Sequence, residues 1–270
     1  MTELLLVGGG ALIGMLLAML GAGGSILLLP LLVVGAGVGP SEAVPLSLIV
    51  VTVLALANLW PVLVRRQLAI RPALLLGLPA LLGAWLGGSL VKQGLIAPSV
   101  QLGVFTVAAV VAAVLMLRPI VPTSGRSQLR LSGGRSLALV GQGGLVGLLT
   151  GIAGVGGGFA IVPALALLAG LPMRLATGTS LVLIVLNSCV AFLALGVWPG
   201  ALLPRLLPLL LGGGFGVLLG QVLQPHLRER QLRLGFVFLL IGSAALTGWQ
   251  AFLLPVKQLD NMDSSPRSLR

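Results

Sequence analysis

The 270-residue sequence is poor in the residue types that carry most metal binding, redox chemistry and acid–base catalysis. It contains five acidic residues, one His, one Cys and no Tyr. A protein metal site needs several convergent ligands, so the lone His226 and Cys189 exclude a histidine or cysteine cluster. A single cysteine also excludes an internal disulfide. Charge is scarce overall, since Asp, Glu, Lys and Arg together make up 8% of the chain.

The few acidic residues all lie outside the confidently apolar segments. They are Glu3, Glu42, Glu229, Asp260 and Asp263. A cation site or proton relay inside a membrane normally uses a carboxylate at membrane depth. An intramembrane enzyme would need clustered acids, a histidine, or a nucleophile with a base. The sequence therefore predicts no catalytic residue, no metal site and no cofactor, and it favours an anion over a cation as ligand.

Hydrophobic residues dominate what is present. They form 57% of the chain, and the mean hydropathy is +1.16. A soluble protein of this length could not bury so much apolar surface, so we expect an all-α, multi-pass protein of the cell (inner) membrane. The net charge of +11 is carried by Lys and Arg in short polar segments. That pattern is typical of topology-setting charges facing a lipid bilayer and not of nucleic-acid binding. A homo-oligomer is left open.

The sequence repeats itself at an interval of 133 residues, which indicates a duplication. The aligned pairs are Gly21 with Gly154, Gly23-Gly24 with Gly156-Gly157, Pro30 with Pro163, Ser47-Leu48 with Ser180-Leu181, and Gly83 and Gly87 with Gly216 and Gly220. We divide the chain into a first transmembrane repeat (1–117), a polar linker (118–136), a second transmembrane repeat (137–255) and a polar, disordered tail (256–270).

Each repeat contains two short apolar segments followed by three that are long enough to span a bilayer. The segments are 4–20, 25–38, 43–64, 72–91 and 98–117, then 137–153, 158–171, 175–197, 201–223 and 234–254. The two short segments of each repeat meet at a glycine-rich run, and as one helix they would be far longer than one crossing needs. A glycine-broken, re-entrant helix pair fits these lengths better.

The topology follows from that choice but is not fixed by charge. If each glycine-broken pair re-enters, each repeat crosses the membrane three times and the two repeats are inverted. If each pair crosses the membrane once, each repeat crosses four times and the two repeats are parallel. Counting Lys and Arg on each side of the membrane does not separate the two arrangements. We favour inverted repeats, because paired broken helices recur in transporters of that design.

The two glycine runs are the strongest candidates for a binding site. A half-helix that begins inside the membrane presents unpaired N–H groups and a positive dipole end, and glycine lets an anion approach them. The predicted cradle residues are Gly23, Gly24, Ser25, Gly156, Gly157 and Gly158. Additional polar groups could come from Ser47, Thr179, Ser180, Asn58 and Asn187. The alternative for the glycines is close helix packing, and for the two asparagines it is an interhelical hydrogen bond.

Other glycines and Arg174 receive a plainer interpretation. We assign helix packing to Gly83-Gly87, Gly143-Gly147-Gly151 and Gly216-Gly220, because small residues at such spacing let membrane helices approach closely. Arg174 lies just before the Thr179-Ser180 segment, where an interfacial anchor is the preferred interpretation. Attraction of anions to the mouth of a pathway is the alternative.

With these motifs, the chain resembles the TauE/SafE sulfite exporter family, also called the 4-toluene sulfonate uptake permease family. The second half carries the marks GLLTGIAGVGGGFAIVPAL and MRLATGTSLVLIVLNS; the first half carries GMLLAMLGAGGSILLLPLL and SEAVPLSLIV, with Leu46 in place of Thr. The resemblance implies a secondary transporter, not an enzyme, whose substrates are sulfite, related sulfur oxyanions or organosulfonates. The alternatives are a transporter of non-sulfur organic anions and a membrane scaffold without transport activity.

Overall fold

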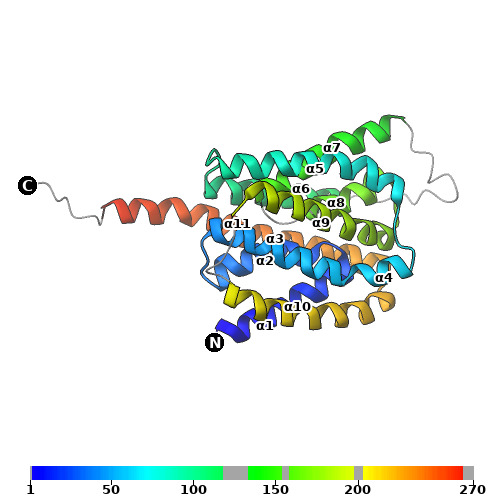
Figure 1. The fold of residues 1–270 in the computed structure, drawn as a ribbon, viewed down its shortest axis with the longest axis horizontal. Coiled ribbons are helices and arrows are strands. Elements are labelled where there is room, and N and C mark those ends of the chain that lie inside the picture. Colours follow the sequence, from blue (N-terminus) through cyan, green and yellow to red (C-terminus); the bar gives the residue numbers. More distant parts are fainter. Residues whose placement is uncertain (1, 118–132, 154–157, 198–202, 264–270) are drawn as a thin grey trace, which may run out of the picture.

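The computed structural model describes residues 2–117, 133–153, 158–197 and 203–263, and every regular element in these ranges is a helix (Figure 1). The α-helices are α1 (Thr2–Leu20), α2 (Gly23–Pro30), α3 (Pro40–Ala57), α4 (Leu59–Val64), α5 (Ile70–Lys92), α6 (Pro98–Leu117), α7 (Gly133–Ala153), α8 (Gly158–Pro163), α9 (Met173–Leu195), α10 (Leu203–Leu223) and α11 (Glu229–Asp263). Short turns of wider or tighter helix continue α2 over Leu31–Gly35, α8 over Ala164–Leu168 and α10 over Gln224–His226.

The prediction of an all-α, multi-pass membrane protein is confirmed. Within the described ranges, five helices are long and apolar enough to cross a membrane, namely α5, α7, α9, α10 and α11. Each of the ten predicted apolar segments contains a helix in its described part, and one of them is divided: a turn at Asn58 separates α3 from α4. Residues 118–132 of the predicted linker lie outside the described residues, and α11 continues to Asp263 within the segment assigned to a tail.

The helices expose their large apolar side chains and bury their small ones. On α5, the side chains of Leu78, Leu82 and Leu86 are 60%, 71% and 58% exposed. Ala80 and Ala84 of the same helix are fully buried. Residues four apart share a face of a helix, so α5 has a leucine face and an opposite face of small residues. This is the distribution expected where lipid covers the outside and helices approach closely inside.

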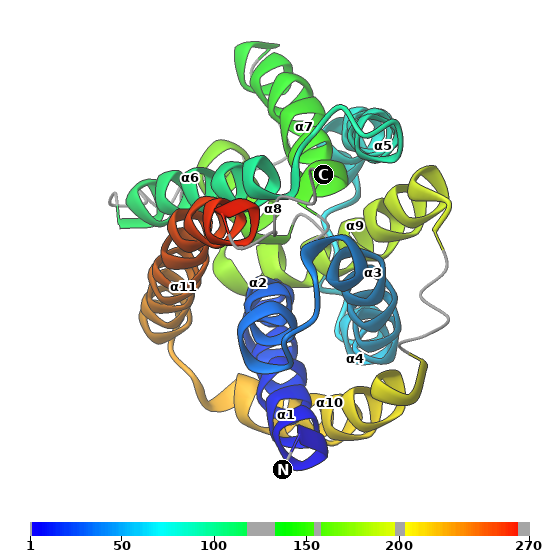
Figure 2. The ribbon, with the colours of Figure 1, turned by 90° about the vertical axis from the view of Figure 1, so that its left-hand side faces the viewer.

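Two closely packed helix pairs form the frame of the molecule, and each joins one half of the chain to the other. Helix α1 packs along α10, and α5 packs along α7 (Figures 1 and 2). A Cβ atom added to Gly14 would lie within 3.0 Å of the backbone of Gly213, and one added to Gly147 within 3.0 Å of the backbone of Ala80. These two contacts join positions that correspond at the interval of 133 residues.

The same close approach recurs at every glycine assigned above to packing. A Cβ added to any of them would come within 3.0 Å of the backbone of the partner helix; they are Gly83, Gly87, Gly143, Gly147, Gly151, Gly216 and Gly220. The packing interpretation of these glycines is therefore confirmed. Because lipid provides no hydrophobic drive for helices to associate, such backbone contact is a main source of attraction between them.

Helices α1 and α2 form a hairpin whose tip lies inside the molecule. A Cβ added to Gly35, at the end of the α2 extension, would lie 3.3 Å from the side chain of Leu5 near the start of α1. The chain therefore returns toward the end from which it came. Figure 1 shows α7 and α8 making the corresponding excursion from the opposite end of the molecule.

Three chain segments far apart in sequence meet at one end of the molecule, on the right in Figure 1. The guanidinium of Arg174, at the start of α9, donates hydrogen bonds to the carbonyl oxygens of Pro225 (3.1 Å) and Leu227 (3.0 Å) in the α10–α11 link. Gly178 packs against Gln67 in the α4–α5 link. Inverted repeats would place Arg65, Arg174 and Arg228 at one end, whereas parallel repeats would separate them.

The glycine contacts give a matched test within α7. Gly147→Ala should lower the stability of the folded protein by about 1–3 kcal/mol, because its methyl group meets the backbone of α5. Gly144→Ala should be neutral or slightly stabilising, because no atom lies within 4 Å of an added Cβ there. Thermal unfolding in detergent measures both; equal losses in the two variants would contradict this account of the α5–α7 contact.

Candidate functional site

The two helix breaks meet in the interior of the protein. The first break contains Gly21, with φ of +72°, a conformation that favours glycine, followed by Ala22. The second break ends at Gly158, where α8 begins. A Cβ added to Gly158 would lie 2.7 Å from the Cβ of Ala22 and 2.6 Å from the Cδ1 of Ile184. Ile184 is the central residue of α9, so the breaks come together beside the middle of a spanning helix.

The predicted cradle is described in part. Gly23 begins α2, so the first N–H groups of that helix and the positive end of its dipole face the break. Gly24 is buried, and an added Cβ would lie within 3.0 Å of Ile13 and Leu17 of α1. Gly156, Gly157 and the side chain of Ser25 lie outside the described residues.

Of the two predicted hydroxyl residues of α9, Ser180 lies at the first break and Thr179 does not. The hydroxyl of Ser180 is buried, 3.1 Å from the carbonyl oxygen of Gly21 and 2.7 Å from that of Thr177, and can donate to either. The hydroxyl oxygen of Thr179 accepts a hydrogen bond from the backbone N–H of Ala69 at 2.9 Å. Ser180 therefore lines the break, whereas Thr179 binds the loop that precedes α5.

The predicted polar residues in α3 and at its C-terminal end make hydrogen bonds within α3 or to neighbouring helices. The Ser47 hydroxyl donates to the carbonyl oxygen of Val44 at 2.8 Å. The Asn58 side-chain oxygen accepts a hydrogen bond from the Gln221 amide of α10 at 3.0 Å, and its amide nitrogen lies 3.4 Å from the carbonyl oxygen of Leu17. Asn58 thus makes an interhelical hydrogen bond, as its alternative interpretation predicted. Its partner Gln221 was not among the residues predicted from the sequence.

Asn187 has the opposite environment to Asn58. Its side chain is fully buried, and within the described residues neither its amide nitrogen nor its oxygen has a hydrogen-bond partner. The adjacent hydroxyl of Ser188, which the sequence analysis did not select, is also buried and unpaired. Leaving such a group unpaired costs about 1–3 kcal/mol, so each case calls for a physical reason.

The position of Asn187 on α9 connects it to the helix breaks. It lies one turn beyond Ile184 and two turns beyond Ser180, and residues at these intervals share one face of a helix. Along that face, the Ser180 hydroxyl comes first, then Ile184, which contacts Gly158, and then the Asn187 amide. Every side chain on it is uncharged. Elsewhere in the described ranges, no three His, Cys, Asp or Glu side chains lie close enough to hold a metal ion.

Comparisons with known proteins agree with this architecture. A sequence profile described as "Sulfite exporter TauE/SafE" matches residues 6–247. A protein of Xylella fastidiosa strain Temecula1, named "Probable membrane transporter protein", is 37% identical over 180 residues, which cover 65% of this chain and 67% of that protein. A protein of the same name from strain 9a5c is 36% identical over the same coverage. No solved structure matches the chain significantly.

The two asparagines give opposite expectations for stability when each is replaced by the similarly sized leucine. Asn187→Leu should leave the thermal unfolding temperature equal or higher, because it removes two unpaired buried polar atoms. Asn58→Leu should lower stability by about 1–3 kcal/mol, because the amide of Gln221 loses its acceptor. If Asn187→Leu proved as destabilising as Asn58→Leu, Asn187 would have a structural partner and its link to a ligand would fail.

Proposed function

The chain belongs to the TauE/SafE sulfite exporter family, and we propose that it is a secondary transporter that carries sulfite, a related sulfur oxyanion or an organosulfonate between its two helix breaks. The family and the names of the relatives make the protein a membrane transporter and not an enzyme. The identity of the cargo and the place where it binds are the proposed part.

The observation that carries the proposal is the buried Asn187 amide beside the meeting point of the breaks, which has no hydrogen-bond partner among the residues that the structure describes. An amide NH₂, the Ser188 hydroxyl and the first N–H groups of α2 are all hydrogen-bond donors, which suit the oxygens of an anion. The Asn187 oxygen is an acceptor and suits an anion that still carries a proton, such as hydrogensulfite. The residues on this face include no carboxylate to repel an anion or to bind a cation.

We further propose that the two halves are inverted repeats and that transport proceeds by alternating access around the breaks. Three features support this arrangement. The α1–α10 and α5–α7 pairs make their closest contacts at positions that are equivalent by the 133-residue interval. The two hairpins enter the molecule from opposite ends, and Arg65, Arg174 and the α10–α11 link share one end. The excess of arginine at that end supports assigning it to the cytoplasmic side of the inner membrane, because positive residues favour that side.

The alternatives make different use of the same residues. A transporter of non-sulfur organic anions would use the same donors, and a panel of sulfur oxyanions, sulfonates and carboxylates in a flux assay separates it from the proposal. A scaffold without transport activity would leave the buried, unpaired Asn187 without a role. The first test is therefore a flux measurement on variants that remain folded.

Purified protein in liposomes should take up radiolabelled sulfite saturably, and Asn187→Leu should reduce the initial rate at least about tenfold, as expected when a buried hydrogen bond to a charged ligand is lost. Cys189→Ala is the matched control, because this half-buried residue lies about 200° further around α9 and should leave the rate unchanged. Normal sulfite flux in a correctly inserted Asn187→Leu protein would contradict the proposed site.

Single cysteines in a Cys189→Ala background test the inverted arrangement. Arg66→Cys and His226→Cys should resist a membrane-impermeant maleimide in intact cells, whereas Gln93→Cys at the other end of α5 should react. Inverted repeats place positions 66 and 226 on one side of the membrane, and parallel repeats place them on opposite sides. Labelling of His226→Cys without labelling of Arg66→Cys would therefore exclude the proposed topology; permeabilised cells provide the control for reactivity.

A further inference from the structure

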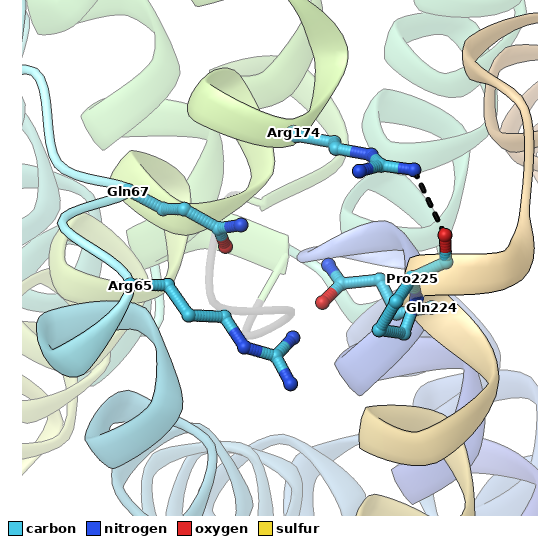
Figure 3. Close-up of a pocket in the computed structure, with 5 residues that line it drawn as sticks. All are labelled: Arg65, Gln67, Arg174, Gln224 and Pro225. Carbon is cyan, nitrogen blue, oxygen red and sulfur yellow. Dashed lines mark hydrogen bonds between the residues drawn. The ribbon is translucent and has the colours of Figure 1, made fainter.

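A polar pocket of about 280 Å³ opens at the end of the molecule where the α4–α5 link, α9 and the α10–α11 link meet. It is lined by Arg65, Gln67, Arg174, Gln224 and Pro225. Figure 3 shows the side chains of Arg65, Gln67 and Gln224 pointing toward the same space from opposite walls. Two guanidinium groups and two carboxamides thus line one cavity, and none of the described residues that line it is acidic.

The two arginines differ in how they are held. Arg174 is fixed by its hydrogen bonds to the carbonyl oxygens of Pro225 and Leu227, which involve one of its terminal nitrogens. A guanidinium has five N–H donors, so donors of Arg174 remain available. The backbone N–H of Arg65 donates to the carbonyl oxygen of Pro61, whereas its guanidinium makes no hydrogen bond or ion pair within the described residues. The nearby carboxylate of Glu229 is bound to the backbone N–H of Met173 at 2.6 Å and forms no ion pair with either arginine.

Both walls of the pocket lead to the first helix break through short hydrogen-bonded connections. On one wall, Ala69 lies two residues after Gln67 and donates its N–H to Thr179, the neighbour of Ser180 at the break. On the other wall, Gln221 lies one turn before Gln224 and donates to Asn58, which contacts the carbonyl oxygen of Leu17 at the end of α1. Polar contacts therefore connect both walls of the pocket to helices that border the break.

The duplication of the sequence does not repeat the polar lining residues of this pocket. The positions that correspond to its polar lining residues at the interval of 133 residues are occupied by Trp198, Gly200, Ser41 and Val91. None of these side chains is charged. An anion approaching from the arginine-rich end therefore meets two guanidinium groups that the equivalent sequence positions of the other repeat do not supply.

We propose that this pocket is a second anion-binding site, which collects a small oxyanion such as sulfite from the arginine-rich side before it passes to the helix breaks. Its role as a loading site rests on the transport function proposed above, whereas its capacity to bind an anion does not. Arginine donors match the oxygens of sulfur oxyanions in pairs, and a positive site raises the local concentration and capture rate of anions. A loading site cannot change the equilibrium distribution of the cargo across the membrane. Its effect is kinetic: it lowers the KM for sulfite supplied at the arginine-rich face.

Uptake of radiolabelled sulfite into membrane vesicles of both orientations tests the proposal. Arg65→Gln should raise KM about tenfold when sulfite is supplied at the arginine-rich face, through loss of a charge-assisted contact, and less than about twofold at the other face. Arg66→Gln is the matched control, because it removes the same charge from the neighbouring residue, which does not line the pocket. Arg65→Lys should restore part of the affinity.

Three results would overturn the proposal: equal KM changes at both faces, equal changes in Arg65→Gln and Arg66→Gln, or no change in either variant. If Asn187→Leu abolishes flux while Arg65→Gln leaves KM unaltered, the loading site is wrong and the proposed transport site stands.

Calorimetric titration with sulfite tests whether the pocket binds an anion, even if no transport is measured. The folded Asn187→Leu protein should bind sulfite, and the Asn187→Leu, Arg65→Gln double variant should bind it about tenfold more weakly. Binding that is unchanged in the double variant, or absent from Asn187→Leu, would contradict the proposal.

Discussion

Close backbone contact between helices from opposite halves of the chain is the interaction on which this structure depends. Lipid surrounds the helices with surface as apolar as their own, so burial of leucine gives little reason for them to associate. Glycine removes the side chain that would hold two helices apart, and in α1 with α10 and in α5 with α7 the backbones nearly touch. These two pairs form a rigid frame, and the interrupted helices α2 and α8 lie between them with α3 and α9.

Within that frame, the breaks can exist because protein surrounds them. An open backbone facing lipid would leave N–H and C=O groups unpaired at a cost of several kcal/mol each. Here the carbonyl oxygen of Gly21 lies within hydrogen-bond distance of the Ser180 hydroxyl, and Gly158 packs closely beside Ala22. Asn187 and Ser188 are the exceptions on α9, since their buried polar atoms have no partner in the described part of the chain. A frame that satisfies most of its polar groups and leaves a few donors open at one point is suited to binding a small polar ligand there.

Hydropathy and glycine spacing predict the helices well, because the bilayer fixes how long an apolar segment must be and close packing fixes where glycine is needed. They do not distinguish Asn58 from Asn187, since both are amides on apolar helices. The difference arises from Gln221, more than 160 residues from Asn58, which reaches only one of them. The turn at Asn58 and the pocket at Arg65 and Arg174 likewise could not be predicted from the sequence. The pocket depends on which loops share an end of the molecule, and counting charges could not decide that.

The pairing of α1 with α10 has a consequence for how the chain is made. When α1 leaves the ribosome, the helix that will cover its glycine face has not yet been synthesised, and most of the protein must be inserted before that partner arrives. Helix α5, in contrast, meets α7 early, within the next stretch of chain. The α5–α7 pair can therefore form during synthesis, whereas the glycine face of α1 stays without its α10 partner until most of the chain has been made. A truncation that removes α10 would leave that face uncovered, although α10 lies far from α1 in the sequence.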